Sequence, residues 1–457
     1  MKLSIILTFF LLCSSVYGVQ TATEELPDEK EPFSVNAFVL SLKSTLDAHG
    51  VDEAIKLFST LNEEEASLEQ IRYLQSSMLI SAKRYGEAQV IAKELMELSP
   101  QNKDYIFLNI LICKARGDKV GKKQLLERIL SIDKNNLEAL TELADEQMLI
   151  KNYKKAREYY SKALKVKSNY SPALFGLGKI DYYQENFAAG KKTFKQVLQV
   201  DNKNSLAYSY LAKIAMEEDS YSEAEEYLKK AIKIHPDNYL YWLELGECYR
   251  DGNKMNEAID AFTKSIELNK DYFLTYLFRG SAFDYKEKYV EALNDYLQVL
   301  TINPDYYLIL EPAGQLAWKL EKWALCSQIY KRLYAQDPKS VYYLSMYSAS
   351  MIKNGQKSSL KTFLSQNFKN FPKDSAEYSI TRLFFDDVWG IVITQRIKKK
   401  EKKRERDYMQ LCLALYYDAN NDWYRATSIY KEIHDTSDGN PVLQRFCRWN
   451  LDRIDNG

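Results

Sequence analysis

Histidine is scarce in this chain, with 3 in 457 residues, which is too few for a site built on histidine acid–base chemistry or metal binding. Net charge is also lacking, because 63 basic residues balance 63 acidic ones. A nucleic-acid binder normally carries a basic surplus. The sequence contains neither a Walker loop nor a Gly-x-Gly-x-x-Gly motif. We therefore expect no catalysis, no cofactor, no metal site and no nucleic-acid partner.

Cysteines and long apolar runs are few. Five of the 6 cysteines lie far apart within apolar helical patterns, so we expect buried thiols. The one long apolar run, Leu3 to Leu12, follows Lys2 and precedes small residues, as in a secretory signal peptide. We predict that residues 1–18 are cleaved. An uncleaved anchor and a lipoprotein modified at Cys13 remain alternatives.

Residues 19–34 are predicted to be an acidic, flexible leader, because they contain five acidic residues and two prolines. The remaining chain is rich in Lys, Tyr and Asn and poor in Pro. Together with the signal sequence, this usage favours an exported protein of the periplasm or cell envelope. Secretion and lipid anchoring are the alternatives.

Proline spacing reveals an internal repeat. Five of the ten prolines are separated by 34 residues or a multiple of 34, namely Pro100, Pro236, Pro304, Pro338 and Pro372. With these prolines at position 32, ten repeats of 34 residues cover 35–374. Position 8 of each repeat is usually small, position 20 is usually alanine, and position 24 is always apolar or aromatic.

Each repeat predicts two helices. Positions 4, 7, 8 and 11 form the apolar stripe of one helix, and positions 20, 24 and 27 form that of a second. A small residue at 8 facing alanine at 20 would let the two helices approach closely. The repeat at 239–272 carries Trp242, Leu245, Gly246, Tyr249, Ala258 and Phe262.

With these residues the chain resembles the tetratricopeptide repeat (TPR) family. The resemblance implies an all-α TPR solenoid, a right-handed superhelix of antiparallel helix pairs with about eleven to twelve repeats. No repeat carries the lysine and asparagine pair with which some members of that family clamp an acidic C-terminal peptide.

The last part of the chain is less regular. Residues 375–406 depart from the pattern, 407–440 return to it, and 441–457 are predicted to form a C-terminal capping helix. The densest basic run, Lys398 to Arg406, is either a solvated helix or a contact for anionic lipid headgroups or an acidic partner.

The first helix of each repeat has a second face, formed by positions 2, 5, 9, 12 and 13. The resemblance implies that this face lines a concave groove, and aromatic anchors with scattered charges are typical of protein-binding surfaces. The predicted partner-binding residues are Tyr73, Phe175, Lys179, Tyr182, Tyr183, Lys213, Glu247, Arg250, Tyr285, Trp318 and Tyr342.

We therefore expect an exported scaffold that binds a protein or peptide partner through this groove, with no catalysis. Two alternatives stay open. The aromatics could bind carbohydrate or lipid in the envelope, or they could merely join successive first helices. The partner's identity and the oligomeric state are not predicted.

Overall fold

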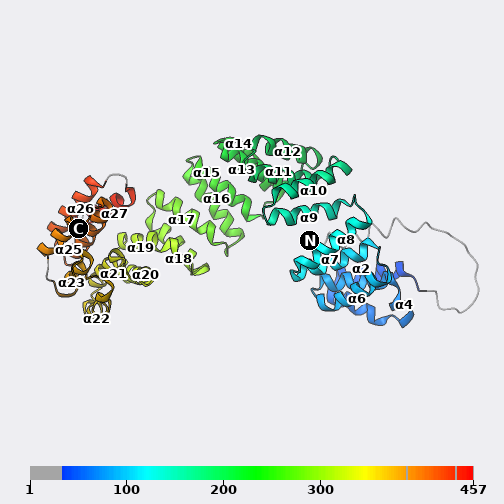
Figure 1. Ribbon diagram of the computed structural model, residues 1–457, viewed down its shortest axis with the longest axis horizontal. Coiled ribbons are helices and arrows are strands. Elements are labelled where there is room, and N and C mark those ends of the chain that lie inside the picture. The colour runs from blue at the N-terminus through cyan, green and yellow to red at the C-terminus, as the bar shows by residue number, and fades with distance from the viewer. Residues whose placement is uncertain (1–32, 388–389, 438–439, 456–457) are drawn as a thin grey trace, which may run out of the picture. The chain divides into compact units, whose positions relative to one another are not determined.

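The computed structural model describes residues 33–387, 390–437 and 440–455 (Figure 1). The predicted signal peptide and the leader up to residue 32 lie outside these residues. Every regular element within them is a helix, which confirms the all-α prediction. None of these helices has the length and apolar character that crossing a bilayer requires.

The chain divides into two compact bodies between Asn202 and Lys203. The N-terminal body contains α2 (Val35–His49), α3 (Val51–Lys56), α4 (Glu63–Ser67), α5 (Glu69–Ser81), α6 (Tyr85–Leu98), α7 (Lys103–Arg116), α8 (Lys119–Ile132), α9 (Leu137–Leu149), α10 (Tyr153–Val166), α11 (Ser171–Tyr183) and α12 (Phe187–Val200).

The C-terminal body contains α13 (Ser205–Glu217), α14 (Tyr221–Ile234), α15 (Tyr239–Asp251), α16 (Met255–Leu268), α17 (Phe273–Tyr285), α18 (Tyr289–Ile302), α19 (Leu310–Lys319), α20 (Trp323–Gln336), α21 (Val341–Lys353), α22 (Lys357–Asn367), α23 (Ala376–Asp386), α24 (Gly390–Lys398), α25 (Lys403–Ala419), α26 (Trp423–Thr436) and α27 (Pro441–Asp455). Three short 3₁₀ turns, at Leu57–Thr60, Tyr307–Ile309 and Phe368–Asn370, complete the described elements.

Helix starts follow the 34-residue period. First helices begin at position 1 of their repeats, as at Glu69, Lys103 and Leu137, and second helices begin at position 17. The first helix of repeat 307–340 is the exception: α19 begins at Leu310, after a 3₁₀ turn. Pro312 lies in its first turn, where a missing N–H is tolerated.

Local capping explains this regularity. Asparagine at position 34 accepts a hydrogen bond from a backbone N–H at the start of the next first helix, as Asn136 does from Ala139 N at 2.9 Å. The same cap occurs at Asn102, Asn204 and Asn238. The turn between the two helices has a left-handed residue at position 15, such as Lys151 (φ 57°) and Asn253 (φ 61°).

The two helices of a repeat pack very closely at position 8. A Cβ added to Gly246 would lie 2.4 Å from the Phe262 ring, and one added to Gly280 would lie 2.7 Å from the Tyr296 ring. Position 8 also meets position 20, because Ser76 Oγ donates to the Ala88 carbonyl at 3.1 Å. The small residue at position 8 therefore faces position 20, and the aromatic ring at position 24 fills the space beside them.

The C-terminal helix α27 spans Pro441–Asp455, within the segment where a terminal helix was predicted, and it also contacts repeats earlier in the chain. Helix α27 folds back onto earlier repeats, where Trp318 Nε1 donates to Asn450 Oδ1 at 2.7 Å and Trp449 Nε1 donates to Tyr289 OH at 3.1 Å. It does so because its inner face is apolar, with Phe446 fully buried.

A buried ion cluster joins the helices of this region. Asp418 of α25 is fully buried and pairs with Lys353 of α21 at 3.1 Å and with Arg453 of α27. Tyr430 of α26 donates its hydroxyl hydrogen to Asp418 at 3.1 Å. One carboxylate therefore connects four helices.

Candidate functional site

Two of the predicted partner-binding residues are inaccessible. Trp318 is 1% exposed, covered by α27, and Tyr342 is 8% exposed, with its ring 5.3 Å from that of Tyr408 on α25. Neither can contact a partner without unfolding of the C-terminal body. The assignment of these two side chains to the binding face is therefore wrong.

Most of the other predicted residues are partly buried and contact a neighbouring helix. Several join successive first helices, as in the open alternative: Tyr73 with Tyr105 (ring centroids 5.9 Å apart), Lys179 with Asp145 (3.9 Å), Lys213 with Glu244 (2.9 Å) and Arg250 over Phe278 (5.1 Å). Phe175 packs instead against Phe194 of the second helix in its own repeat, at 5.6 Å.

Glu247 belongs to this partly buried group. Burial raises the pKa of its carboxyl group, and the neighbouring Arg250 opposes that shift.

Two predicted residues are more than half exposed, Tyr183 at 51% and Tyr285 at 64%. Both occupy position 13, at the end of a first helix. They are the only residues of the predicted set that the structure classes as exposed, and they lie in different bodies.

Tyr183 contacts the start of α10, which follows a turn that carries two exposed aliphatic residues. Its ring stacks on that of Tyr153, with centroids 6.2 Å apart and an interplanar angle of 8°, and lies 5.5 Å from that of Tyr182. Leu149 and Ile150, at the end of α9, are 79% and 69% exposed. We call these five residues the Tyr183 edge.

Sequence analysis missed Leu149 and Ile150. They could have been found from their position in the repeat. They occupy positions 13 and 14, just before the turn, where most other repeats have a polar or small residue. Two adjacent exposed aliphatic residues there do nothing for the turn itself. Exposed apolar side chains that lie together are a candidate contact surface.

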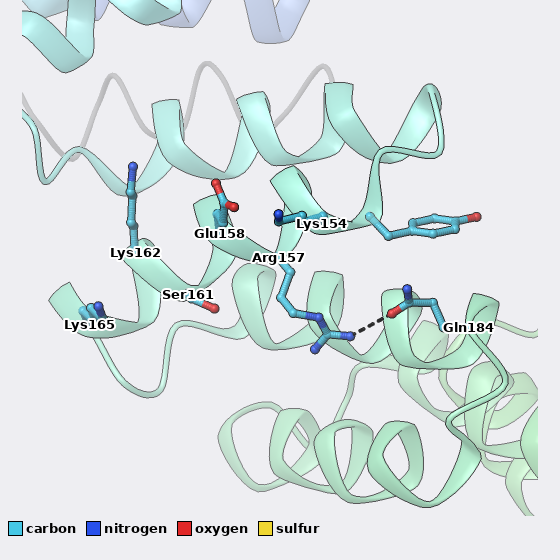
Figure 2. A pocket seen from close by; sticks show the side chains of 8 residues that line it. Lys154, Arg157, Glu158, Ser161, Lys162, Lys165 and Gln184 are labelled. Carbon is cyan, nitrogen blue, oxygen red and sulfur yellow. Dashed lines mark hydrogen bonds between the residues drawn. The ribbon is translucent and has the colours of Figure 1, made fainter.

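A recess of about 650 Å³ lies beside the Tyr183 edge and shares Tyr153 with it. Helix α10 supplies most of its lining, and Gln184 closes one end (Figure 2). Arg157 Nη2 pairs with Asp181 at 2.6 Å and donates to Gln184 Oε1 at 3.2 Å. The remaining charged lining residues are Lys154, Lys162, Lys165 and Glu158.

The basic run 398–406 is divided between the end of α24, a short connection and the start of α25. Lys400 pairs with Glu377 at 2.6 Å, and Arg406 Nη1 donates to the carbonyls of Lys400 and Glu401. Part of the run therefore stabilises its own connection, while Lys398 and Lys399 are exposed.

The cysteines of the described residues are mostly buried. Cys248, Cys326, Cys412 and Cys447 are buried, as expected, while Cys113 is partly exposed. Burial raises the pKa of the Cys326 thiol to about 12, which disfavours the reactive thiolate. Within the described ranges, no group of three or more His, Cys, Asp or Glu side chains could hold a metal ion.

Comparison with known proteins shows what this chain is similar to. Models of the tetratricopeptide repeat match residues 137–170, 175–239 and 211–272. No curated protein matches the sequence.

Three solved structures are similar to different lengths of this chain. YrrB, described as a TPR protein with an unusual peptide-binding site, is 20% identical over 41% of this chain and 96% of its own, with a TM-score of 0.34. PilF of Pseudomonas aeruginosa is 19% identical over 46% of this chain and 94% of its own, with a TM-score of 0.40. The APC/C hetero-tetramer Cut9–Hcn1 is 18% identical over 69% of this chain and 63% of its own, with a TM-score of 0.42.

Proposed function

We propose that this chain, a tetratricopeptide-repeat protein with repeats matched directly between residues 137 and 272, is an exported scaffold that binds a protein or peptide without performing chemistry. The observation that carries this proposal is the Tyr183 edge. It holds aromatic and aliphatic side chains, of which Leu149, Ile150 and Tyr183 keep half or more of their surface in water.

The physical argument is one of burial. Leu149, Ile150 and Tyr183 keep most of their surface in water, although fully burying such a side chain is worth about 1.5–3 kcal/mol. A partner that covers the three together gains that free energy. The stacked Tyr153 supports the Tyr183 ring, so little conformational entropy is lost when a partner binds.

The proposal includes no catalytic step. His49, His235 and His434 lie in or beside the ends of different helices, and none lines the recess or the Tyr183 edge. The Tyr183 edge consists of aromatic and aliphatic side chains, and the recess beside it adds lysines. Such a set supports recognition and offers no nucleophile paired with a base.

Export is the second part of the proposal, and the periplasm or cell envelope is the proposed location. The supporting feature is the signal-like sequence in residues 1–18, with Lys2 before an apolar run and small residues after it. Cell fractionation with N-terminal sequencing tests it: we expect a mature chain beginning near Val19 outside the cytoplasm. A cytoplasmic chain that retains residues 1–18 would contradict export.

Site-specific photocrosslinking tests the binding face. We expect benzoylphenylalanine at Ile150 to give a discrete crosslinked species in the native cell. The same probe at Tyr424, which is 89% exposed on α26, is the matched control and should not give that species. Tyr183→Ala in the Ile150 probe background should abolish the crosslink.

Thermal melting separates binding from folding in this experiment. Tyr183→Ala should melt close to the parent, because the side chain is half exposed. Trp318→Ala should melt early, because truncating a buried aromatic typically costs about 3–5 kcal/mol. The proposal fails if the Tyr424 probe gives the same species, or if Tyr183→Ala leaves the Ile150 crosslink intact.

A further inference from the structure

The second helices α10 and α12 carry an uneven share of the chain's charge. Together they contain eight Lys or Arg residues and a single acidic residue, Glu158. The whole chain is balanced at 63 basic and 63 acidic residues. In the C-terminal body, α16 and α18 contain one basic and five acidic residues at equivalent places in the repeat.

The recess concentrates this positive charge. Lys154, Lys162 and Lys165 are exposed around it, and none of the three forms an ion pair within the described part of the chain. Figure 2 shows Lys162 and Lys165 together, Lys154 apart from them, and Arg157 directed toward Gln184. An anion held in the recess is attracted by these three lysines and by Arg157, against a single acidic lining residue, Glu158.

The shape of the recess and its side chains favour the carboxylates of a polypeptide over lipid headgroups or nucleic acid. A bilayer surface is flat and extended, whereas these charges surround a recess between α10 and Gln184. Single-stranded nucleic acid is usually held by open aromatic faces, but one face of the Tyr153 ring is covered by Tyr183. Flexible lysines with Ser161 and Gln184 beside them match carboxylates spaced along a polypeptide.

We infer that the α10 recess binds an acidic segment of a partner protein, in which Glu or Asp side chains pair with Lys154, Lys162 and Lys165. This surface is separate from the first-helix face, because its charges come from a second helix. Tyr153 joins the recess to the Tyr183 edge, so an acidic segment seated here could continue onto that edge.

Fluorescence anisotropy on the full chain tests this inference. The probe is a short fluorescein-labelled peptide of alternating Glu and Asp, compared with the same peptide of Gln and Asn. We expect the acidic peptide to bind at about 0.05 M salt and to be released at about 0.5 M, where the Debye length is only a few ångströms. The neutral peptide should not bind.

The decisive comparison uses two triple variants of equal charge. Lys154→Gln/Lys162→Gln/Lys165→Gln removes the recess lysines. Lys270→Gln/Lys331→Gln/Lys361→Gln removes three exposed lysines of the C-terminal body. We expect the first variant to weaken peptide binding about tenfold or more and the second to change it about twofold or less. Both sets are exposed, so both variants should fold.

Three outcomes would overturn the inference. The two triple variants could lose binding equally, which would indicate non-specific charge attraction. The acidic peptide could bind no better than the neutral one. Phosphatidylserine vesicles could displace the peptide and depend on the same lysines, which would indicate a lipid site. The Ile150 crosslink and peptide binding are measured separately, so failure of the Tyr183 edge proposal is separable from failure here.

Discussion

Among the glycines of helices α13 to α21 in the C-terminal body, Gly246 leaves the least room for an added side chain. Its missing Cβ would lie 2.4 Å from the Phe262 ring, and Phe262 is fully buried. Gly246→Leu should therefore force the two helices of repeat 239–272 apart. We expect the free energy of unfolding to fall by about 1–3 kcal/mol or more, measured by thermal or urea denaturation.

Gly86→Leu is the matched control for that change. Gly86 also lies in a helix, but an added Cβ would meet nothing within 4 Å. Leucine is a better helix former than glycine, so stability should be unchanged or raised by up to about 1 kcal/mol. Equal melting of the two variants would contradict the packing described at position 8.

For single residues, the sequence predicts contacts within a repeat but does not predict contacts between residues far apart in the chain. Gly246 could be assigned to a close approach because its partner lies in the same repeat, 16 residues along the chain. Trp318 could not be assigned to the core, because it is buried by Asn450, which is 132 residues away. Trp318 occupies position 12 of its repeat, and that position does not indicate a contact with α27.

Helix α14 offers a test of how neighbouring repeats are held together. Glu225 accepts hydrogen bonds from Lys229 at 2.7 Å, Lys254 at 2.9 Å and Tyr249 OH at 3.1 Å. Lys229 lies on the same helix, whereas Tyr249 and Lys254 belong to the next repeat. These donors, with Lys229 and Lys254 foremost, lower the pKa of the Glu225 carboxyl from 4.5 to about 2.

A lowered folded-state pKa fixes the direction of the pH effect. The stabilisation is fully present above about pH 4.5 and is lost as the pH falls toward about 2, where the folded protein also binds the proton. Glu225→Gln should therefore lower the melting temperature at neutral pH, and the difference from the parent should vanish near pH 2. The loss should be about 1 kcal/mol or less, because the site is near the surface.

Glu226→Gln provides the comparison on the same helix, because Glu226 is exposed and forms no ion pair within the described residues. It should leave the melting temperature nearly unchanged throughout the titration. A constant difference between Glu225→Gln and the parent, from neutral pH to pH 2, would show that the carboxylate charge is not what joins the repeats.

Elements were predictable wherever their causes are local. Helix starts at positions 1 and 17 follow from capping residues and turn chemistry that recur every 34 residues. The place of α27 was not predictable, although its helical pattern was. Its apolar face has partners on α19 and on α26, and a helix pattern alone does not say which earlier element it will cover.

The core of the molecule is divided unevenly along the chain. From Ile266 to Trp449 nearly all of the buried apolar side chains belong to a single cluster. The repeats before Ile266 hold several smaller clusters, such as the one around Tyr160 and the one around Leu228. Stability in a repeat protein is roughly a sum of repeats and their interfaces, so this division predicts separate opening events.

Hydrogen exchange with Asp418→Ala tests that division. The change leaves Lys353 and Arg453 partly buried without their carboxylate, and removing one partner of a buried pair costs about 3–5 kcal/mol. We expect α21, α25 and α27 to lose protection together, by about two orders of magnitude or more. Helices α9 to α12, which lie in the other body, should exchange as in the parent.

Asp422→Ala provides the control, because Asp422 caps α26 through Arg425 N and pairs with Arg425 nearby. Loss of this cap should cost about 1 kcal/mol and raise exchange only near the start of α26. Two results of the Asp418→Ala experiment would contradict the proposed division. Loss of protection confined to α25 would mean that the buried carboxylate does not couple the helices. Equal loss in α9 to α12 would mean that the chain opens as one cooperative unit, despite its separate clusters.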